Sequence, residues 1–124
     1  MAEQQQRLQA LTEEYQKLQT DLQNSISSRQ KLESQQQENK GVQKEFSALD
    51  STSNIYKLVG PVLLKQDKTE AVMAVDGRLE FIDKEIKRVE QAIKEIQDKS
   101  DGLKMEIIQL QSSTQAAQPQ AAAA

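Results

Sequence analysis

Apolar residues recur every three or four positions along most of the chain, which is the spacing of one face of an α-helix. The first such pattern covers about residues 3–49, and the residues between the apolar ones are mostly the good helix formers Gln, Glu, Lys and Arg. So narrow an apolar stripe is typical of a coiled-coil seam, which predicts a long helix paired with another helix. The seam positions are Leu8, Leu11, Tyr15, Leu18, Leu22, Ser25, Arg29, Leu32, Gln36 and Asn39, then Val42, Phe46 and Leu49 after a three-residue step. Its polar middle predicts a loosely packed stretch that sets the register.

The second helical pattern covers about residues 68–111 and is the more regular of the two. Its seam alternates steps of three and four residues through Val75, Leu79, Ile82, Ile86, Val89, Ile93, Ile96, Ser100, Leu103, Ile107 and Leu110. Asp67 and Glu70 have the spacing of a capping box, so we expect this helix to begin beside them. If the two helices pair antiparallel, with residue numbers that add up to about 118, both seams are buried and the chain ends meet at one tip.

A short β-type segment, about residues 54–66, lies between the two helical patterns and is rich in Val, Leu, Ile and Tyr. The turn-forming residues Asp50 to Asn54 lead into it. Gly60-Pro61 at its centre predicts a type II′ turn, because Gly can adopt the positive φ of the first position and Pro the negative φ of the second. The predicted pairs are Ile55–Gln66, Lys57–Leu64 and Val59–Val62 on one face, and Tyr56–Lys65 and Leu58–Leu63 on the other.

Both faces of the predicted hairpin carry apolar side chains, although a two-stranded ribbon alone in water is marginally stable. Both of its edges also have unpaired backbone groups, and nothing else in the sequence suggests a third strand. Either the hairpin packs on the helices, or strands from other chains complete its sheet. We favour the second alternative because the helices are committed to each other. The predicted assembly residues are Ile55, Tyr56, Leu58, Val59, Gly60, Pro61, Val62, Leu63 and Leu64.

The composition fits an elongated molecule with little core. Only 36% of the 124 residues are hydrophobic and 3% aromatic, against about 45–50% apolar residues in typical globular domains. The net charge of −3 suggests neither nucleic acid nor membrane as the main partner. The sequence has no signal-peptide pattern and no cysteine, so we expect a cytoplasmic location. Residues 112–124 are rich in Ala and Gln, which predicts a disordered tail.

The chain lacks the residues on which most enzyme sites depend. It has no His and no Cys, and its four glycines are scattered, so no phosphate-binding loop is present. Carboxylates such as Glu13, Glu14 and Glu85 lie on predicted helix faces near lysines, where solvated ion pairs explain them. We therefore predict no catalytic residue, no cofactor and no metal, and a protein that is not an enzyme.

Residues 55–67, with the sequence IYKLVGPVLLKQD and followed by Glu70-Ala71, resemble the β-class subunits of prefoldin. Residues 78–88 also resemble that family's second helix. The resemblance implies a mainly α fold over residues 1–111, a long antiparallel two-helix coiled coil whose central β-hairpin joins an intersubunit β-barrel. It also implies a hetero-hexamer of two α-class and four β-class subunits. Such a complex holds unfolded polypeptides, notably actin and tubulin, and delivers them to the cytosolic chaperonin without ATP.

The resemblance further implies that clients bind at the tip far from the hairpin. The candidate residues there are Leu8, Leu11, Tyr15, Leu103, Met105, Ile107, Ile108 and Leu110. Ser100 and Gly102 should weaken the neighbouring turn, so that slight splaying exposes this set. Alternatively, Leu8, Leu11, Leu103 and Leu110 merely close the coil. A separate alternative for the function is a structural coiled-coil scaffold or tether without client binding. An interfacial lipid-binding helix fits poorly, because the apolar stripes are narrow and flanked by mixed charges.

Overall fold

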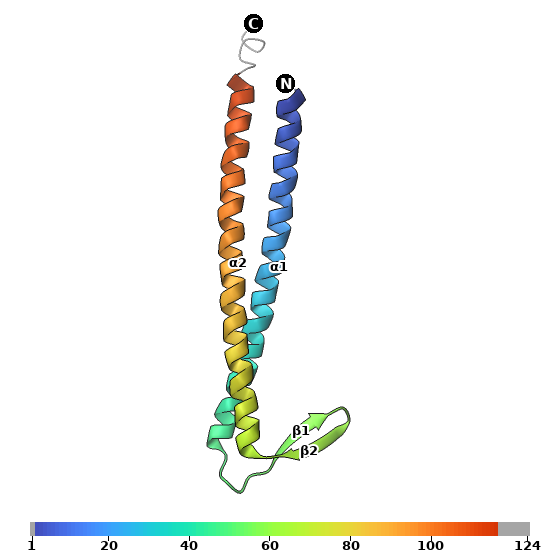
Figure 1. Cartoon of the computed structure of the whole chain (residues 1–124), viewed down its shortest axis with the longest axis vertical. Helices are drawn as coiled ribbons and strands as arrows, with labels where there is room; N and C mark the ends of the chain where they lie inside the picture. The colour runs from blue at the N-terminus through green and yellow to red at the C-terminus, as the bar shows by residue number, and fades with distance from the viewer. Residues whose placement is uncertain (1, 117–124) are drawn as a thin grey trace. The chain divides into compact units, whose positions relative to one another are not determined.

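The computed structural model describes residues 2–116, which form two long helices with one β-hairpin between them in sequence (Figure 1). Helix α1 spans Ala2–Ala48, strands β1 and β2 span Ile55–Val59 and Val62–Gln66, and helix α2 spans Lys68–Ala116. This is the predicted mainly α fold with a central hairpin. Neither helix of the described part is long and apolar enough to cross a membrane.

Contacts between residues divide the chain into two compact units. One unit is drawn from Met1–Ser27 and Glu90–Ala124, and we call it the terminal unit. The other is Ser28–Val89, and we call it the hairpin unit because it contains both strands. The boundary of a single domain at residue 111 stays a prediction.

Helix α1 ends at Ala48, where turn-forming residues replace helix formers. The Asp50 carboxylate accepts hydrogen bonds from the Thr52 N–H at 2.9 Å and from the Thr52 and Ser53 hydroxyls at 2.6 and 3.1 Å. These bonds favour the charged form and lower the pKa of Asp50, with the Thr52 hydroxyl contributing most. Because a side chain bonded to its own neighbours stabilises a turn, the backbone leaves the helix here and enters the hairpin.

Helix α2 begins at Lys68, directly after the predicted cap residue Asp67. The Asp67 carbonyl accepts a hydrogen bond from the Ala71 N–H at 3.0 Å, as the carbonyl of an N-cap residue does. The predicted capping-box bonds are absent: among the hydrogen bonds of residues 2–116, none joins the Asp67 or Glu70 carboxylate to the first turn. Both carboxylates are exposed, so water can solvate them. Lys68 instead donates to the Leu49 carbonyl at 2.9 Å and ties α2 to the end of α1.

The core of the hairpin unit comes mainly from α2. Its buried apolar side chains on that helix are Ala71, Val75, Leu79, Ile82 and Val89. Burial of a Val, Leu or Ile side chain contributes about 1.5–3 kcal/mol. No described side chain of α1 is buried, although its seam in this unit includes the apolar residues Leu32, Val42 and Phe46. In this unit the other seam positions of α1 are half-buried, whereas Val42 is 37% exposed. Two successive three-residue steps, from Gln36 to Asn39 and from Asn39 to Val42, turn Val42 away from the seam.

Glutamines of α1 donate hydrogen bonds to α2 and define the helix pairing within each unit. In the hairpin unit, Gln36 donates to Asp83 at 2.6 Å and Gln43 donates to Asp76 at 2.9 Å, which makes this pairing antiparallel. In the terminal unit, Gln19 donates to Ser100 at 3.0 Å. The two residue numbers add up to 119 in each of these pairs, against the predicted value of about 118.

Helix α2 continues to Ala116 and so includes the first residues of the predicted disordered tail, which the sequence places from residue 112 onward. The Thr114 hydroxyl donates to the Leu110 carbonyl at 2.9 Å, so a hydroxyl residue is accommodated inside the helix. Gln and Ala, which follow it, are good helix formers. The rest of the predicted tail, residues 117–124, lies outside the described residues.

Candidate functional site

The hairpin has the turn and the register predicted from its sequence. Gly60 has a φ of 59°, and no other described residue has a positive φ, so Gly60-Pro61 forms a type II′ turn. Strands β1 and β2 pair antiparallel, from Ile55 opposite Gln66 to Val59 opposite Val62. Side chains therefore alternate between the two faces in the predicted way.

Six apolar side chains of the hairpin face solvent, with exposed fractions between 48% and 69%. We call them the hairpin surface: Tyr56, Leu58, Val59, Val62, Leu63 and Leu64. Ile55, also a predicted assembly residue, is only 8% exposed and lies beside Ala71 and Val75 of α2. The hairpin is thus anchored to its own helices at the end where Ile55 pairs with half-buried Gln66, while the other side chains of both strands are exposed. Because this sheet contains only β1 and β2, each strand has an unpaired edge within the described residues.

Exposed apolar surface is concentrated on the hairpin unit. Of the eleven large apolar side chains that are exposed in the described residues, nine belong to it, and Met105 and Ile108 belong to the terminal unit. The nine include Met73 and Phe81 of α2, which the sequence analysis missed. The signal that could have found them is their position, eight residues apart on one helix and outside the seam. Patches of this kind are typical of protein interaction sites.

Gly60→Val should reduce assembly far more than Pro61→Ala. A Cβ at Gly60 would meet no atom within 4 Å, so the cost comes from the φ of 59° and not from a clash. Such strain costs on the order of 1–3 kcal/mol, and a β-branched side chain makes it worse. Ala can adopt the φ of Pro61 at a cost of about 0.4–1 kcal/mol in chain entropy. Yields of reconstituted complex measure the difference, and equal yields would mean that the turn has been misread.

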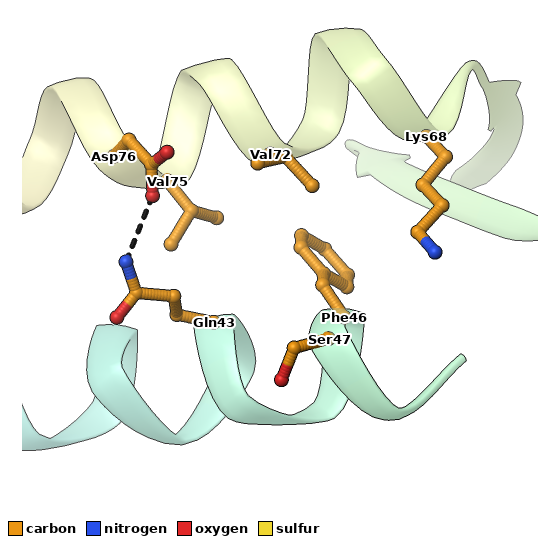
Figure 2. A pocket seen from close by; sticks show the side chains of 7 residues that line it. All are labelled: Gln43, Phe46, Ser47, Lys68, Val72, Val75 and Asp76. Atoms are coloured by element: carbon orange, nitrogen blue, oxygen red, sulfur yellow. Dashed lines mark hydrogen bonds between the residues drawn. The ribbon is translucent and has the colours of Figure 1, made fainter. Parts of the chain in front are cut away.

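The helices enclose a pocket of about 210 Å³ where α1 ends and α2 begins (Figure 2). Phe46 of α1 points toward Val72 and Val75 of α2 across it. The hydrogen bond from Gln43 to Asp76 lies at one side of the pocket. These contacts join the two helices at the base from which the hairpin extends, so the hairpin surface is presented from a packed support.

The terminal unit carries the predicted client-binding residues. The six that belong to the seams are half-buried: Leu8, Leu11, Tyr15, Leu103, Ile107 and Leu110. Met105 and Ile108 lie outside the seam and are 58% and 46% exposed. A shallow pocket of about 180 Å³ lies nearby, between Arg7 of α1 and residues 106–113 of α2. The open apolar surface of this unit therefore comes from Met105 and Ile108, while the seam residues pack in the helix pair.

Ser100 does not weaken the terminal unit in the way that the sequence suggests. Its side chain is 4% exposed, and its hydroxyl accepts the hydrogen bond from Gln19. A buried hydroxyl with a partner links the two helices instead of loosening them. This contact gives no support to splaying next to Ser100.

The sequence of the chain matches known proteins over most of its length. A family described as prefoldin subunit matches residues 9–114. Prefoldin subunit 6 of Homo sapiens is 44% identical over 114 residues, which cover 92% of this chain and 88% of that protein. Prefoldin subunit 6 of Saccharomyces cerevisiae is 44% identical over 105 residues, covering 85% and 92%. The Arabidopsis thaliana protein of the same name is 37% identical over 102 residues, covering 82% and 79%.

The fold also matches a solved structure. The crystal structure of the prefoldin β subunit from Thermococcus strain KS-1 superposes with a TM-score of 0.76 and covers 90% of this chain and 91% of that one. Its sequence is 24% identical, so this likeness concerns the fold alone.

Proposed function

Because the chain belongs to the prefoldin family, and thus to the subunits of the prefoldin co-chaperone complex, we propose that it acts in a hetero-hexamer that holds unfolded polypeptides without ATP. In this proposal the complex delivers its clients, notably actin and tubulin, to the cytosolic chaperonin, and the chain works in the cytoplasm. The observation that carries the proposal is the open, apolar hairpin surface with two free strand edges.

The hairpin surface is proposed to be the contact with the other prefoldin subunits. Its six side chains would gain about 25 cal/mol for each Å² of apolar surface that a partner covers. Strands from neighbouring subunits would pair with the free backbone groups of β1 and β2, in an intersubunit β-barrel that leaves no free edge. The anchored residue Ile55 then serves the chain's own fold and supports assembly by holding β1 in place.

Unfolded clients are proposed to bind at the terminal unit. Met105 and Ile108 supply apolar surface that is open in the isolated chain, and Met adapts to varied partners because its side chain is flexible and polarizable. So small a patch gives weak binding by itself. Several subunits acting on one client raise the overall affinity through high effective concentration.

This function needs no catalytic group. Ion pairs of the described residues join neighbours on one helix, such as exposed Lys84 with exposed Glu80, and exposed Arg88 with half-buried Glu85. Pairs of this kind contribute little to stability. They also do not provide a general acid and a general base positioned in a cleft for catalysis. The proposed work of the chain is therefore binding alone.

Suppression of aggregation distinguishes a holdase from a structural scaffold. Chemically denatured actin is diluted into buffer without ATP, and light scattering is followed with the reconstituted complex, with the complex lacking this chain, and with no complex. The full complex should suppress scattering when present in about equimolar amounts, since clients bind through several subunits at once. An assembled complex that leaves scattering unchanged would favour the scaffold.

A further inference from the structure

A groove of about 370 Å³ lies between strand β1 and the helices of the hairpin unit. Its size is at the lower end of the roughly 300–1,000 Å³ typical of ligand clefts, enough for one or two large side chains. The residues that matter here are Val42 of α1, Tyr56, Lys57 and Leu58 of β1, and Ala74 and Arg78 of α2. Apolar side chains form most of its wall, so it favours an apolar occupant.

The charged residues that line the groove are both basic. Lys57 approaches from β1 and Arg78 from α2, and the lining contains no Asp or Glu. This differs from the whole chain, which has a net charge of −3. A carboxylate beside the apolar part of the occupant would therefore be attracted, and a basic occupant repelled.

The groove is continuous with the surface proposed for assembly. Tyr56 and Leu58 line the groove and also belong to the exposed hairpin surface. On α2, Ala74, Arg78 and Phe81 are spaced by four and three residues, so they share one helix face. Phe81 is exposed and extends the apolar character of this face beyond the groove. A subunit that pairs with β1 would therefore lie next to the groove opening.

We propose that the groove receives an apolar segment of a neighbouring prefoldin subunit that carries a carboxylate, with Lys57 and Arg78 as the groups that select it. Assembly then depends on this face of α2 as well as on strand pairing. The strands supply contacts that any hairpin of the family could make, while the groove distinguishes one neighbour from another by charge. This inference rests on the proposed function, because it requires that the chain assembles with other subunits.

The test compares two charge reversals on the same helix in the full reconstituted complex. Arg78→Glu changes the groove, whereas Lys84→Glu changes an exposed lysine that does not line it. Arg78→Glu should weaken incorporation about tenfold and flatten its dependence on salt, because the new carboxylate repels the occupant's carboxylate and offsets the attraction from Lys57. Lys84→Glu should stay within about twofold of the unchanged chain. Both variants are checked for unchanged helix content by circular dichroism.

A second pair of variants tests the shape of the groove without charge. Ala74→Trp fills the space with a large side chain and should reduce incorporation, while Ala74→Ser leaves the space open and should not. Equal incorporation of Arg78→Glu and Lys84→Glu, together with normal incorporation of Ala74→Trp, would overturn the groove proposal. If holding of denatured actin is lost by Arg78→Glu complexes that assemble normally, the groove binds clients and the proposal is also wrong.

The double variant with Val59→Lys and Leu63→Lys serves as the reference in these experiments. If it fails to assemble while the groove variants assemble normally, the groove inference fails and the proposed function stands. If it assembles normally, the hairpin is not the contact with other subunits, and both proposals fall together.

Discussion

The double variant Val59→Lys with Leu63→Lys should be excluded from the prefoldin complex while its helices stay formed. Val59 pairs with Val62 and Leu63 with Leu58, so the two lysines lie on opposite faces of the hairpin. Both native side chains are exposed in the isolated chain, and neither contributes to its core. In an assembled barrel each lysine would be buried without a partner, at a cost of several kcal/mol for each charge. Incorporation should therefore fall by about 100-fold or more.

Gel filtration of a mixture of all subunits measures this loss, and circular dichroism of the isolated variant measures its helix content. The matched control is Gln35→Lys with Gln37→Lys, which adds the same two charges at exposed positions of α1. The control should co-elute with the complex as the unchanged chain does. Co-elution of the hairpin variant as well would refute assembly through the hairpin surface.

Removal of residues 1–12 together with 104–124 should impair client holding and leave assembly intact. The deletion takes away six of the eight predicted client-binding residues, and the remaining two, Tyr15 and Leu103, lose the apolar neighbours beyond them. The hairpin unit, Ser28–Val89, is untouched, so incorporation should be normal. In the proposed function several subunits hold one client, so trimming every β-class subunit should reduce holding much more than trimming one. Client holding is measured as the suppression of light scattering by aggregating denatured actin, and assembly is measured by gel filtration.

A smaller change separates the exposed residues of the tip from those of the seam. Met105→Lys with Ile108→Lys alters side chains that face solvent, so the helix pair should keep its stability. If Met105 and Ile108 bind clients, this variant should suppress the aggregation of denatured actin less well than the unchanged chain, but better than the deletion variant does. Undiminished holding by complexes with every β-class tip trimmed would rule out the terminal unit as the client site.

The turn and the register of the hairpin could be predicted from the sequence, because local chemistry decides both. Pro61 cannot adopt a positive φ and Gly60 can, so only one turn type fits, and a two-residue turn leaves one register. The role of Ile55 could not be predicted in this way. Tyr56, Leu58 and Val59 of the same strand are also apolar, and only the position of α2 decides which of the four is buried.

The helix pairing could be predicted to within one residue, because apolar spacing specifies a face but not the contacts that choose among close registers. Those contacts are the side-chain amides of Gln19, Gln36 and Gln43, and glutamine is common on every face of α1. The same limit applies to Ser100, which resembles a weak point in the sequence and is a buried hydrogen-bond acceptor in the structure. The groove beside β1 combines residues from both helices and both strands, so no local pattern indicates it.

The most direct test of the central proposal, that this chain works as one subunit of a client-holding prefoldin hexamer, is the native mass of the complex isolated from cells through a tag on the chain. We expect a particle of six prefoldin-type subunits, from which mass spectrometry identifies both α-class and β-class companions. We also expect a fraction of particles to carry an additional unfolded polypeptide. Isolation of the chain alone, as an assembly of its own copies, or with companions outside the prefoldin family would contradict the account.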